Sequence, residues 1–176
     1  MLKTSTTILL FFILKSSFAQ KQRKVSTYLF AGYNKTIYDI TLGNNPSGIG
    51  LGLQAFLNNK TKFKPTIELA DYIYLENDKV MRLTNNSNPI DDVRSMVNLF
   101  VGSSFHPTQK IYLSFVAGPA FINGQTFLGI KPSFGFYFSE KKKWAGNISY
   151  INVFNRNKST KDDFGSISFA IGLKLF

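Results

Sequence analysis

The sequence predicts an all-β protein, an eight-stranded antiparallel up-and-down transmembrane β-barrel, on three observations. Apolar residues alternate with small or polar residues through most of the chain that follows the N-terminal segment. The 176 residues include 18 Phe, 8 Tyr and 13 Gly. No second long apolar segment follows the N-terminal one, which argues against a helical membrane protein. The strands of a membrane β-barrel alternate, so their average hydropathy stays moderate.

The N-terminal segment, MLKTSTTILLFFILKSSFAQ, has the pattern of an export signal. Lys3 supplies a basic start, an apolar run follows, and Ser17 and Ala19 occupy the small-residue positions of a cleavage site. The apolar run is too short for a spanning helix, which needs about 20 residues. We therefore expect a signal peptide over 1–19 and an outer-membrane barrel domain over 20–176. An uncleaved N-terminal anchor is the alternative.

Composition excludes several classes of protein. The chain has no Cys, which excludes disulfides, cysteine metal sites and a lipid-modified cysteine. The formal net charge of +11 could indicate a nucleic-acid partner. The lysines, however, gather at predicted strand ends and turns, as in SEKKKW and RNKSTK, where cations can pair with lipid phosphates. Together with export, this position argues against nucleic acid.

Clusters of glycine, asparagine, proline and charge divide the remaining chain into segments of similar length. A tilted strand needs about 9–11 residues to cross a membrane. Single-chain outer-membrane barrels have an even number of strands. The predicted strands are 24–36, 47–58, 62–75, 93–106, 110–122, 125–139, 143–155 and 164–176.

Alternation is clearest in the second, sixth and eighth predicted strands. A soluble sandwich has the same period of two. Here, however, the face opposite the apolar one carries glycine, serine and isolated charges, which fit the narrow interior of a small barrel. The predicted outward residues of these strands are Ile49, Leu51, Leu53, Ala55, Leu57, Leu128, Ile130, Pro132, Phe134, Phe136, Phe138, Ile167, Phe169, Ile171, Leu173 and Leu175.

The predicted strand 62–75 contains one residue out of phase. Asp71 falls on the apolar face. Either a bulge near Ala70 reverses the register and turns Tyr72 and Tyr74 outward, or Asp71 lies at the lipid headgroups. We expect the bulge, because it also accounts for the two tyrosines.

The connections between strands alternate in length. Outer-membrane barrels have long loops outside and short periplasmic turns. A periplasmic N-terminus places all the long connections outside, and Asn-Gly in 123–125 predicts a tight hairpin on that outer side. The long connections are 37–46, 76–92 and 156–163, and the short ones are 59–61, 107–109 and 140–142.

Aromatic residues gather near the predicted strand ends. Rings with a polar edge settle at the headgroup level, so we expect two aromatic girdles. Scattered core aromatics in a soluble barrel are the alternative. The periplasmic girdle is predicted to be Phe63, Phe105, Phe138, Trp144 and Phe176, and the outer girdle Tyr33, Tyr72 and Tyr74, together with Tyr38 and Phe154.

Several charged residues fall on lumen-facing positions. A charge on the lipid face costs about 2–4 kcal/mol at mid-membrane, so their phase supports an inward position. Inside a narrow barrel such charges must pair or reach water. We expect Glu68 to pair with at least one of the cations, in a network that fills the lumen. The predicted network is Lys64, Glu68, Arg94, Lys131 and Lys174, with Arg94, Lys131 and Lys174 as the candidate partners.

The export signal, the eight alternating strands and the terminal GLKLF resemble the small outer-membrane β-barrel proteins, the porin-like "outer membrane protein beta-barrel domain" families, over about 24–176. The resemblance implies insertion by a barrel assembly machinery that reads the C-terminal strand and its final aromatic, Phe176. In those families the final aromatic keeps phase with the apolar stripe, whereas here the stripe runs through Leu173 and Leu175. Either Phe176 turns over the rim, or the last residues bulge.

Candidates for catalysis or metal binding are few. The only histidine, His106, lies in the predicted HPTQK turn, and we expect it to be solvated rather than a base beside a nucleophile. One His and no Cys exclude a zinc cluster. Asp91-Asp92 and Asp162-Asp163 could share calcium, but adjacent loop acids are usually solvated. GIGLG lacks the third glycine and the helix of a dinucleotide loop. We expect no enzymatic activity, no cofactor and no metal.

The sequence therefore predicts a monomeric outer-membrane barrel whose lumen is filled by side chains, since eight strands leave no open pore. Its partners would be outer-membrane lipids and the assembly machinery. Function would lie in the outer loops, chiefly 76–92, in binding or adhesion, or in structural support of the envelope. The alternative is a soluble exported lipocalin-like barrel with its apolar stripes inward around a small apolar ligand. A lipid-modifying enzyme and a narrow channel are further alternatives.

Overall fold

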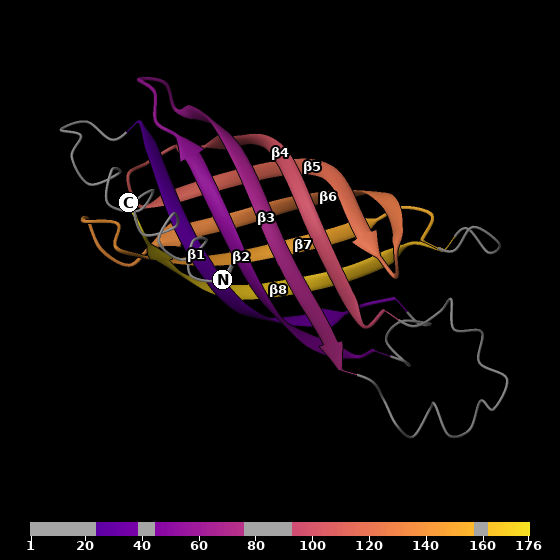
Figure 1. Cartoon of the computed structure of the whole chain (residues 1–176). Coiled ribbons are helices and arrows are strands. Elements are labelled where there is room, and N and C mark those ends of the chain that lie inside the picture. The colour runs from indigo at the N-terminus through magenta and orange to yellow at the C-terminus, as the bar shows by residue number, and fades with distance from the viewer. Residues whose placement is uncertain (1–23, 39–44, 76–92, 157–161) are drawn as a thin grey trace, which may run out of the picture.

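The computed structural model describes residues 24–38, 45–75, 93–156 and 162–176. They form eight antiparallel strands that pair in chain order, and the last strand returns to the first to close a barrel (Figure 1). The predicted fold class is confirmed, and each predicted strand is found with its bounds shifted by at most two residues. The strands are β1 (Val25–Thr36), β2 (Ser47–Leu57), β3 (Phe63–Leu75), β4 (Ser95–Phe105), β5 (Ile111–Ile122), β6 (Gln125–Tyr137), β7 (Trp144–Val153) and β8 (Phe164–Lys174).

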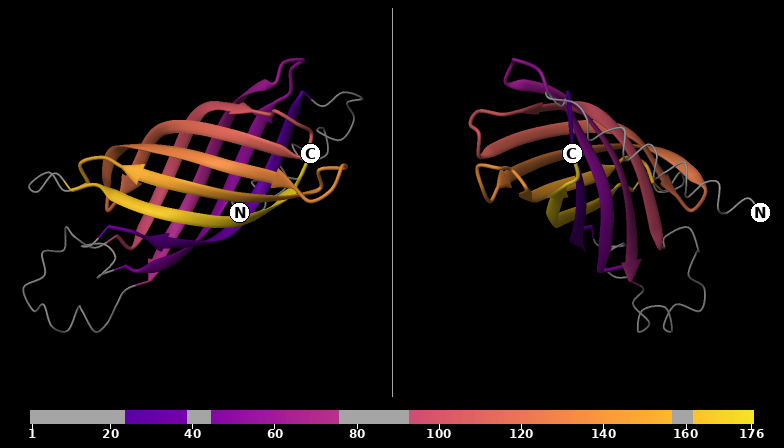
Figure 2. Two further views of the ribbon diagram at one scale, coloured as in Figure 1. Left: turned by 180° about the vertical axis from the view of Figure 1, so that it is seen from behind. Right: turned by 60° about the vertical axis from the view of Figure 1, so that its left-hand side comes forward.

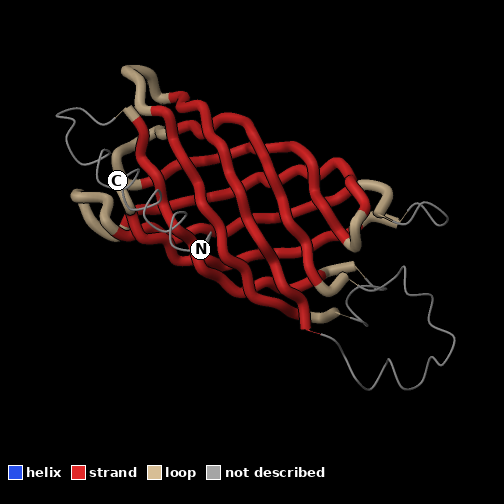
Figure 3. Tube along the Cα trace, viewed as in Figure 1, coloured by secondary structure: helices blue, strands red, loops and turns tan. Residues whose placement is uncertain are grey.

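The two ends of the barrel differ. β1 begins and β8 ends at the end that carries the turns 58–62, 106–110 and 138–143, here called the short-turn end (Figure 1). Strands β1, β3 and β7 end at the opposite end, here called the long-connection end, as the left view in Figure 2 shows. The described chain consists of strands and connections (Figure 3), and it contains no helix long and apolar enough to cross a membrane.

Side chains alternate between the lumen and the exterior along the strands. In β2, Leu51 is 61% exposed whereas Gln54 is 2% exposed. The apolar stripes therefore point away from the barrel axis, as the sequence predicts. They align from strand to strand, because the register places one leucine beside the next over five neighbouring strands. This leucine row is Leu173, Leu29, Leu53, Leu69 and Leu99.

The predicted hairpin between β5 and β6 is present. Ile122 pairs with Gln125, and Asn123 and Gly124 between them have φ angles of 49° and 75°. Two successive positive φ angles are typical of a type I′ turn, which Asn-Gly favours.

The predicted bulge in β3 is wrong. Asp71 pairs with Leu51 on one side and Val97 on the other, in an unbroken register, and it is exposed on the exterior. Tyr72 and Tyr74 therefore keep their phase and point into the lumen, where they are 4% and 3% exposed. Each ring finds a polar partner there for its hydroxyl, so the lumen accepts them without a change of register.

The last residues form the two-against-one arrangement of a bulge. The amide of Leu175 donates to the carbonyl of Thr27 at 2.8 Å, and the amide of Thr27 donates to the carbonyl of Phe176 at 2.9 Å. Two residues at the end of the chain thus share one residue of β1. The half-buried Phe176 therefore departs from the apolar stripe of Leu173 and Leu175.

Candidate functional site

The lumen is filled at three levels. At the long-connection end an apolar cluster that includes Met96, Phe100 and Phe164 packs inside the barrel. At the short-turn end an aromatic cluster centres on Tyr28, Phe56 and further tyrosines. A hydrogen-bonded network of polar side chains lies between the two. The interior is therefore a packed core rather than an open passage.

The middle level is a continuous chain of polar contacts across the lumen, here called the central network. Lys131 of β6 forms an ion pair with Glu68 of β3, and its Nζ also donates to the hydroxyl of Tyr72 at 3.0 Å. Gln54 Nε2 donates to the second carboxylate oxygen of Glu68 at 3.2 Å.

The chain continues from Gln54 to the far side of the barrel. The Tyr112 hydroxyl donates to Gln54 Oε1 at 3.4 Å, and Asn147 Nδ2 donates to the same hydroxyl at 3.1 Å. Both charges of the ion pair are thus paired and further hydrogen-bonded, as buried charges require. The central network connects β2, β3, β5, β6 and β7.

A cavity of about 20 Å³ lies beside the ion pair. Glu68 and Lys131 line it together with small residues such as Gly50 and Ala170. Its size and polar lining suit one water molecule. It is too small for an organic ligand, which usually occupies about 300–1,000 Å³.

The structure separates the charges that the sequence assigned to one network. Lys64 is half-buried at the short-turn end, where its Nζ donates to Asn58 Oδ1 at 3.3 Å. Lys174 is half-buried at the same end, paired in register with Tyr28. Arg94 is exposed at the long-connection end. The ion pair therefore joins Glu68 to Lys131, and the other cations lie toward the rims.

His106 occupies a different place from the one expected. It is 8% exposed rather than solvated. Its ring stacks on Tyr112 with centroids 5.4 Å apart and meets Phe56 edge-on at the same distance. Within the described residues, neither ring nitrogen of His106 has a hydrogen-bond partner. The aromatic cluster at the short-turn end accommodates the ring because the planar imidazole stacks on Tyr112 and Tyr137.

Lowering the pH is expected to destabilise the barrel through His106. Burial, with smaller contributions from the charges of Lys64 and Lys142, lowers the pKa of His106 from 6.5 to about 4. Between these values the unfolded chain binds the additional proton, so the free energy of unfolding falls as pH drops from neutral toward about 4. Urea unfolding midpoints across this range measure the effect, and His106→Phe should remove its share of the dependence. An unchanged pH slope in that variant contradicts the assignment.

The predicted girdle residues divide into exterior and interior groups. Phe63, Phe138 and Trp144 are 61%, 58% and 46% exposed at the short-turn end. Phe105 packs against Phe63 there, with ring centroids 4.8 Å apart. Tyr33 is 50% exposed on β1. The assignment of Tyr72 and Tyr74 to the outer girdle is wrong, because both lie in the lumen.

Another tyrosine pair lies near the long-connection end, on the exterior. The hydroxyls of Tyr38 and Tyr150 are 2.6 Å apart, and each also donates to Asn152 Oδ1. Asn152 in turn donates to Asp163 at 3.2 Å. These tyrosines have the exterior position expected of an outer girdle, which Tyr72 and Tyr74 do not have.

Metal-binding residues do not gather in the described ranges. No group of three or more His, Asp or Glu side chains is placed to hold an ion there. Asp163 accepts hydrogen bonds from Asn152 and from the amide of Asn155, so it supports the connection between β7 and β8. Asp91 and Asp92 lie outside the described residues.

The outer surface of the strands is rich in exposed apolar side chains. Twenty-six large hydrophobic side chains are exposed on the described strands and their ends. Soluble monomers rarely expose a contiguous apolar patch larger than a few hundred Å². The arrangement is the reverse of a lipocalin-like barrel, whose apolar side chains surround an internal ligand.

Comparison with known proteins agrees with this geometry. No family model matches the chain, and no curated protein matches its sequence. Among solved structures, the chain resembles the outer membrane protein Ail of Yersinia pestis in a phospholipid bilayer nanodisc, with a TM-score of 0.55 at 11% identity over 85% of this chain and 98% of that one. This chain has the fold of Ail.

Two crystal structures show the same likeness. That of Ail, the attachment invasion locus protein, matches with a TM-score of 0.54 at 12% identity, over 85% of this chain and 97% of that one. That of Ail with the heparin analogue sucrose octasulfate matches with a TM-score of 0.52 at 11% identity, over 86% and 99%. The predicted resemblance to the small outer-membrane β-barrels is confirmed at the level of the fold.

Proposed function

We propose that the protein is an integral β-barrel of a bacterial outer membrane that acts through its long-connection end, in binding or adhesion. The observation that carries the proposal is the combination of an apolar exterior with a lumen closed at three levels. The apolar exterior favours a lipid environment over water, and closure of the barrel permits it, because each strand pairs on both sides and no open edge faces the hydrocarbon. Because the filled lumen leaves no route for solutes, we assign binding to the ends of the barrel.

Export and assembly complete the proposal. The signal peptide over 1–19 lies outside the described residues and stays a prediction. The short-turn end would face the periplasm, as short turns do in outer-membrane barrels. The assembly machinery would read β8 and Phe176, although Phe176 is out of phase with the apolar stripe before it.

The charge of segment 76–92 argues against a sulfated partner for this segment. The heparin analogue bound in one Ail structure is a polyanion. In this chain, segment 76–92 carries Glu76, Asp78, Asp91 and Asp92 against two cationic residues. Like charges at an interface repel, so the partner of this segment is expected to be neutral or basic rather than a polyanion.

The test compares the full chain with a variant in which 76–92 is replaced by Asn-Gly, the turn that already joins β5 to β6. Each is expressed in the outer membrane of a non-adherent bacterium, and adherence to host cells and to immobilised matrix proteins is counted. Adherence that depends on 76–92 is the expected result, because this is the longest connection. Equal adherence of both strains would contradict a binding role for this segment. Steady large channels formed by the full chain in planar bilayers would contradict the filled lumen.

A structural role in the envelope is the second candidate, and the central network favours it by bracing the lumen. Deletion of the protein would then increase leakage of periplasmic proteins, while replacement of 76–92 would leave leakage at the wild-type level.

A further inference from the structure

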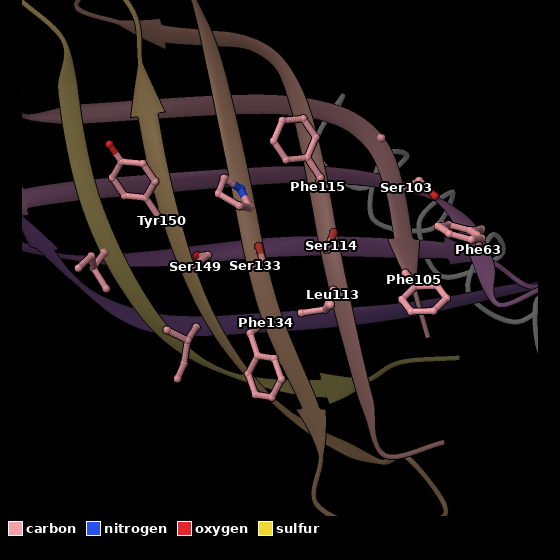
Figure 4. Close-up of a pocket in the computed structure, with 14 residues that line it drawn as sticks. Phe63, Ser103, Phe105, Leu113, Ser114, Phe115, Ser133, Phe134, Ser149 and Tyr150 are labelled. Carbon is pink, nitrogen blue, oxygen red and sulfur yellow. The ribbon is translucent and has the colours of Figure 1, made fainter. Parts of the chain in front are cut away.

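A groove of about 860 Å³ crosses the outer surface of the barrel, lined by residues from β3 to β8 (Figure 4). Its floor is formed at Ser114, Ser133 and Ser149, which lie side by side in register and turn their side chains into the lumen. Figure 4 shows these serines in a row that crosses three strands. These three residues contribute no outward side chain, so the outward side chains on either side of the serine row form the sides of the groove.

The sides of the groove are apolar. Leu113 and Phe134 are paired in register on one side of the serine row (Figure 4). On the other side Phe115 lies between Ser103 of β4 and Pro132 of β6, its two partners in register. Both partners are short side chains, and they leave space beside the Phe115 ring. The groove is therefore lined almost entirely by carbon atoms.

One end of the groove opens at the short-turn end of the barrel. Phe63 and Phe105, whose rings are in contact there, line this mouth. Phe63 directly follows the turn 58–62, and Phe105 directly precedes the turn 106–110. The two turns lie side by side, because the amide of His106 donates to the carbonyl of Lys62 at 2.8 Å.

The turns beside the mouth are cationic. Lys60, Lys62 and Lys110 are all exposed there. The two turns beside the mouth, 58–62 and 106–110, contain these three lysines and no acid. Positive charge therefore lies where a lipid headgroup would be if an acyl chain occupied the groove. Clusters of basic side chains at a membrane surface attract anionic lipids.

We propose that the groove binds one acyl chain of an anionic phospholipid, whose phosphate lies against Lys60, Lys62 and Lys110. This site rests on the proposed membrane insertion and adds a defined lipid ligand to it. The occupant is a phospholipid because the groove faces the hydrocarbon and leads to a cationic rim at the same end of the barrel. The lysines select an anionic headgroup over a zwitterionic one by charge.

The test measures which lipids stay on the protein. The full chain is reconstituted in nanodiscs of phosphatidylcholine that contain a minor share of phosphatidylglycerol. The protein is then released from the nanodiscs, and native mass spectrometry identifies the lipids that stay bound to it. The expected result is selective retention of phosphatidylglycerol. It should fall at least about tenfold in a variant with Lys60, Lys62 and Lys110 changed to Gln, since each lysine near a membrane surface contributes about fivefold.

Matched variants separate the groove from the general charge of the rim. Changing Lys24, Lys141 and Lys143 to Gln removes the same charge from the same end and should leave retention within about twofold of the wild type. Ser103→Phe fills the groove and should reduce retention, whereas Ala31→Phe adds the same ring on β1, away from the groove, and should not.

Two failures are distinguishable. Equal retention of both lipids, or equal losses in the two lysine triples, would overturn the lipid site while the barrel remains inserted. A chain that fails to enter the nanodiscs, and that shows no folded band of altered mobility on unheated gels, would overturn membrane insertion itself.

Discussion

Lys131→Met is expected to lower the free energy of unfolding by about 3–5 kcal/mol, because it leaves Glu68 as an unpaired charge inside the barrel. The carboxylate would keep only the hydrogen bond from Gln54, a neutral donor. The central cavity of about 20 Å³ is too small to hydrate a free carboxylate. Urea unfolding in liposomes, followed by the mobility of the folded band on unheated gels, measures the change.

The double variant Glu68→Gln with Lys131→Met is the control for this prediction. It removes both charges and keeps an amide that can bond to Gln54. Replacing a buried ion pair by neutral groups is often close to neutral, so the double variant should lose less than about half of what Lys131→Met loses. Additive effects of the two substitutions would show that the pair is not coupled, which contradicts the network described above.

Leu69→Arg is expected to destabilise the inserted barrel by about 2–4 kcal/mol, because a cation on the lipid face at mid-membrane is poorly solvated. Leu69 is 48% exposed and lies within the leucine row, between Leu53 and Leu99. In a soluble barrel the same exposed substitution would change stability by less than about 0.5 kcal/mol. Unfolding titrations in liposomes therefore separate the two environments.

Leu75→Arg is the depth control on the same strand. Leu75 is 60% exposed and is the last residue of β3 at the long-connection end. Near the membrane interface the cost of a cation falls to about 0–1 kcal/mol. Equal effects at Leu69 and Leu75 would indicate that no hydrocarbon surrounds the middle of the barrel.

The strands and the exterior could be predicted from sequence because lipid imposes one requirement along the whole strand. Most outward positions near the middle are apolar, so the period of two survives in Leu51 and Leu53 and in their neighbours on adjacent strands, and the exposed Asp71 beside Leu51 is an exception to it. The Asn-Gly turn was equally readable, since two successive positive φ angles favour few residue types.

The lumen was harder to predict, because its requirement changes along the barrel axis. Toward the long-connection end the inward residues of β4 and β5 include Met96, Phe100 and Val116. Both faces of these strands are therefore apolar, and alternation does not show which face points into the lumen. Tyrosine suits either face, which is why Tyr72 and Tyr74 were assigned to the exterior. The charge pattern could suggest Glu68 and Lys131 as inward residues, but only the register shows that their side chains meet.

His106 shows a further limit of local sequence. The HPTQK segment has the composition of a solvated turn. The cluster that buries its first residue comes from β2 and β5, through Phe56 and Tyr112, and closure of the barrel brings these strands together. A residue just beyond a strand can thus belong to the core when the fold is a closed cylinder.

The central network also divides the barrel mechanically. Its side chains come from β2, β3, β5, β6 and β7, whereas β4 and the two strands of the closing seam, β1 and β8, contribute none to it. The seam is held by its backbone ladder and ends in the shared pairing at Thr27. Among the described strands, β1 and β8 pair although they are not consecutive in the chain, so a force that pulls these two strands apart acts directly on the seam. The same topology gives a nascent barrel one defined place at which to close last, because every other pairing joins strands that are consecutive in the chain.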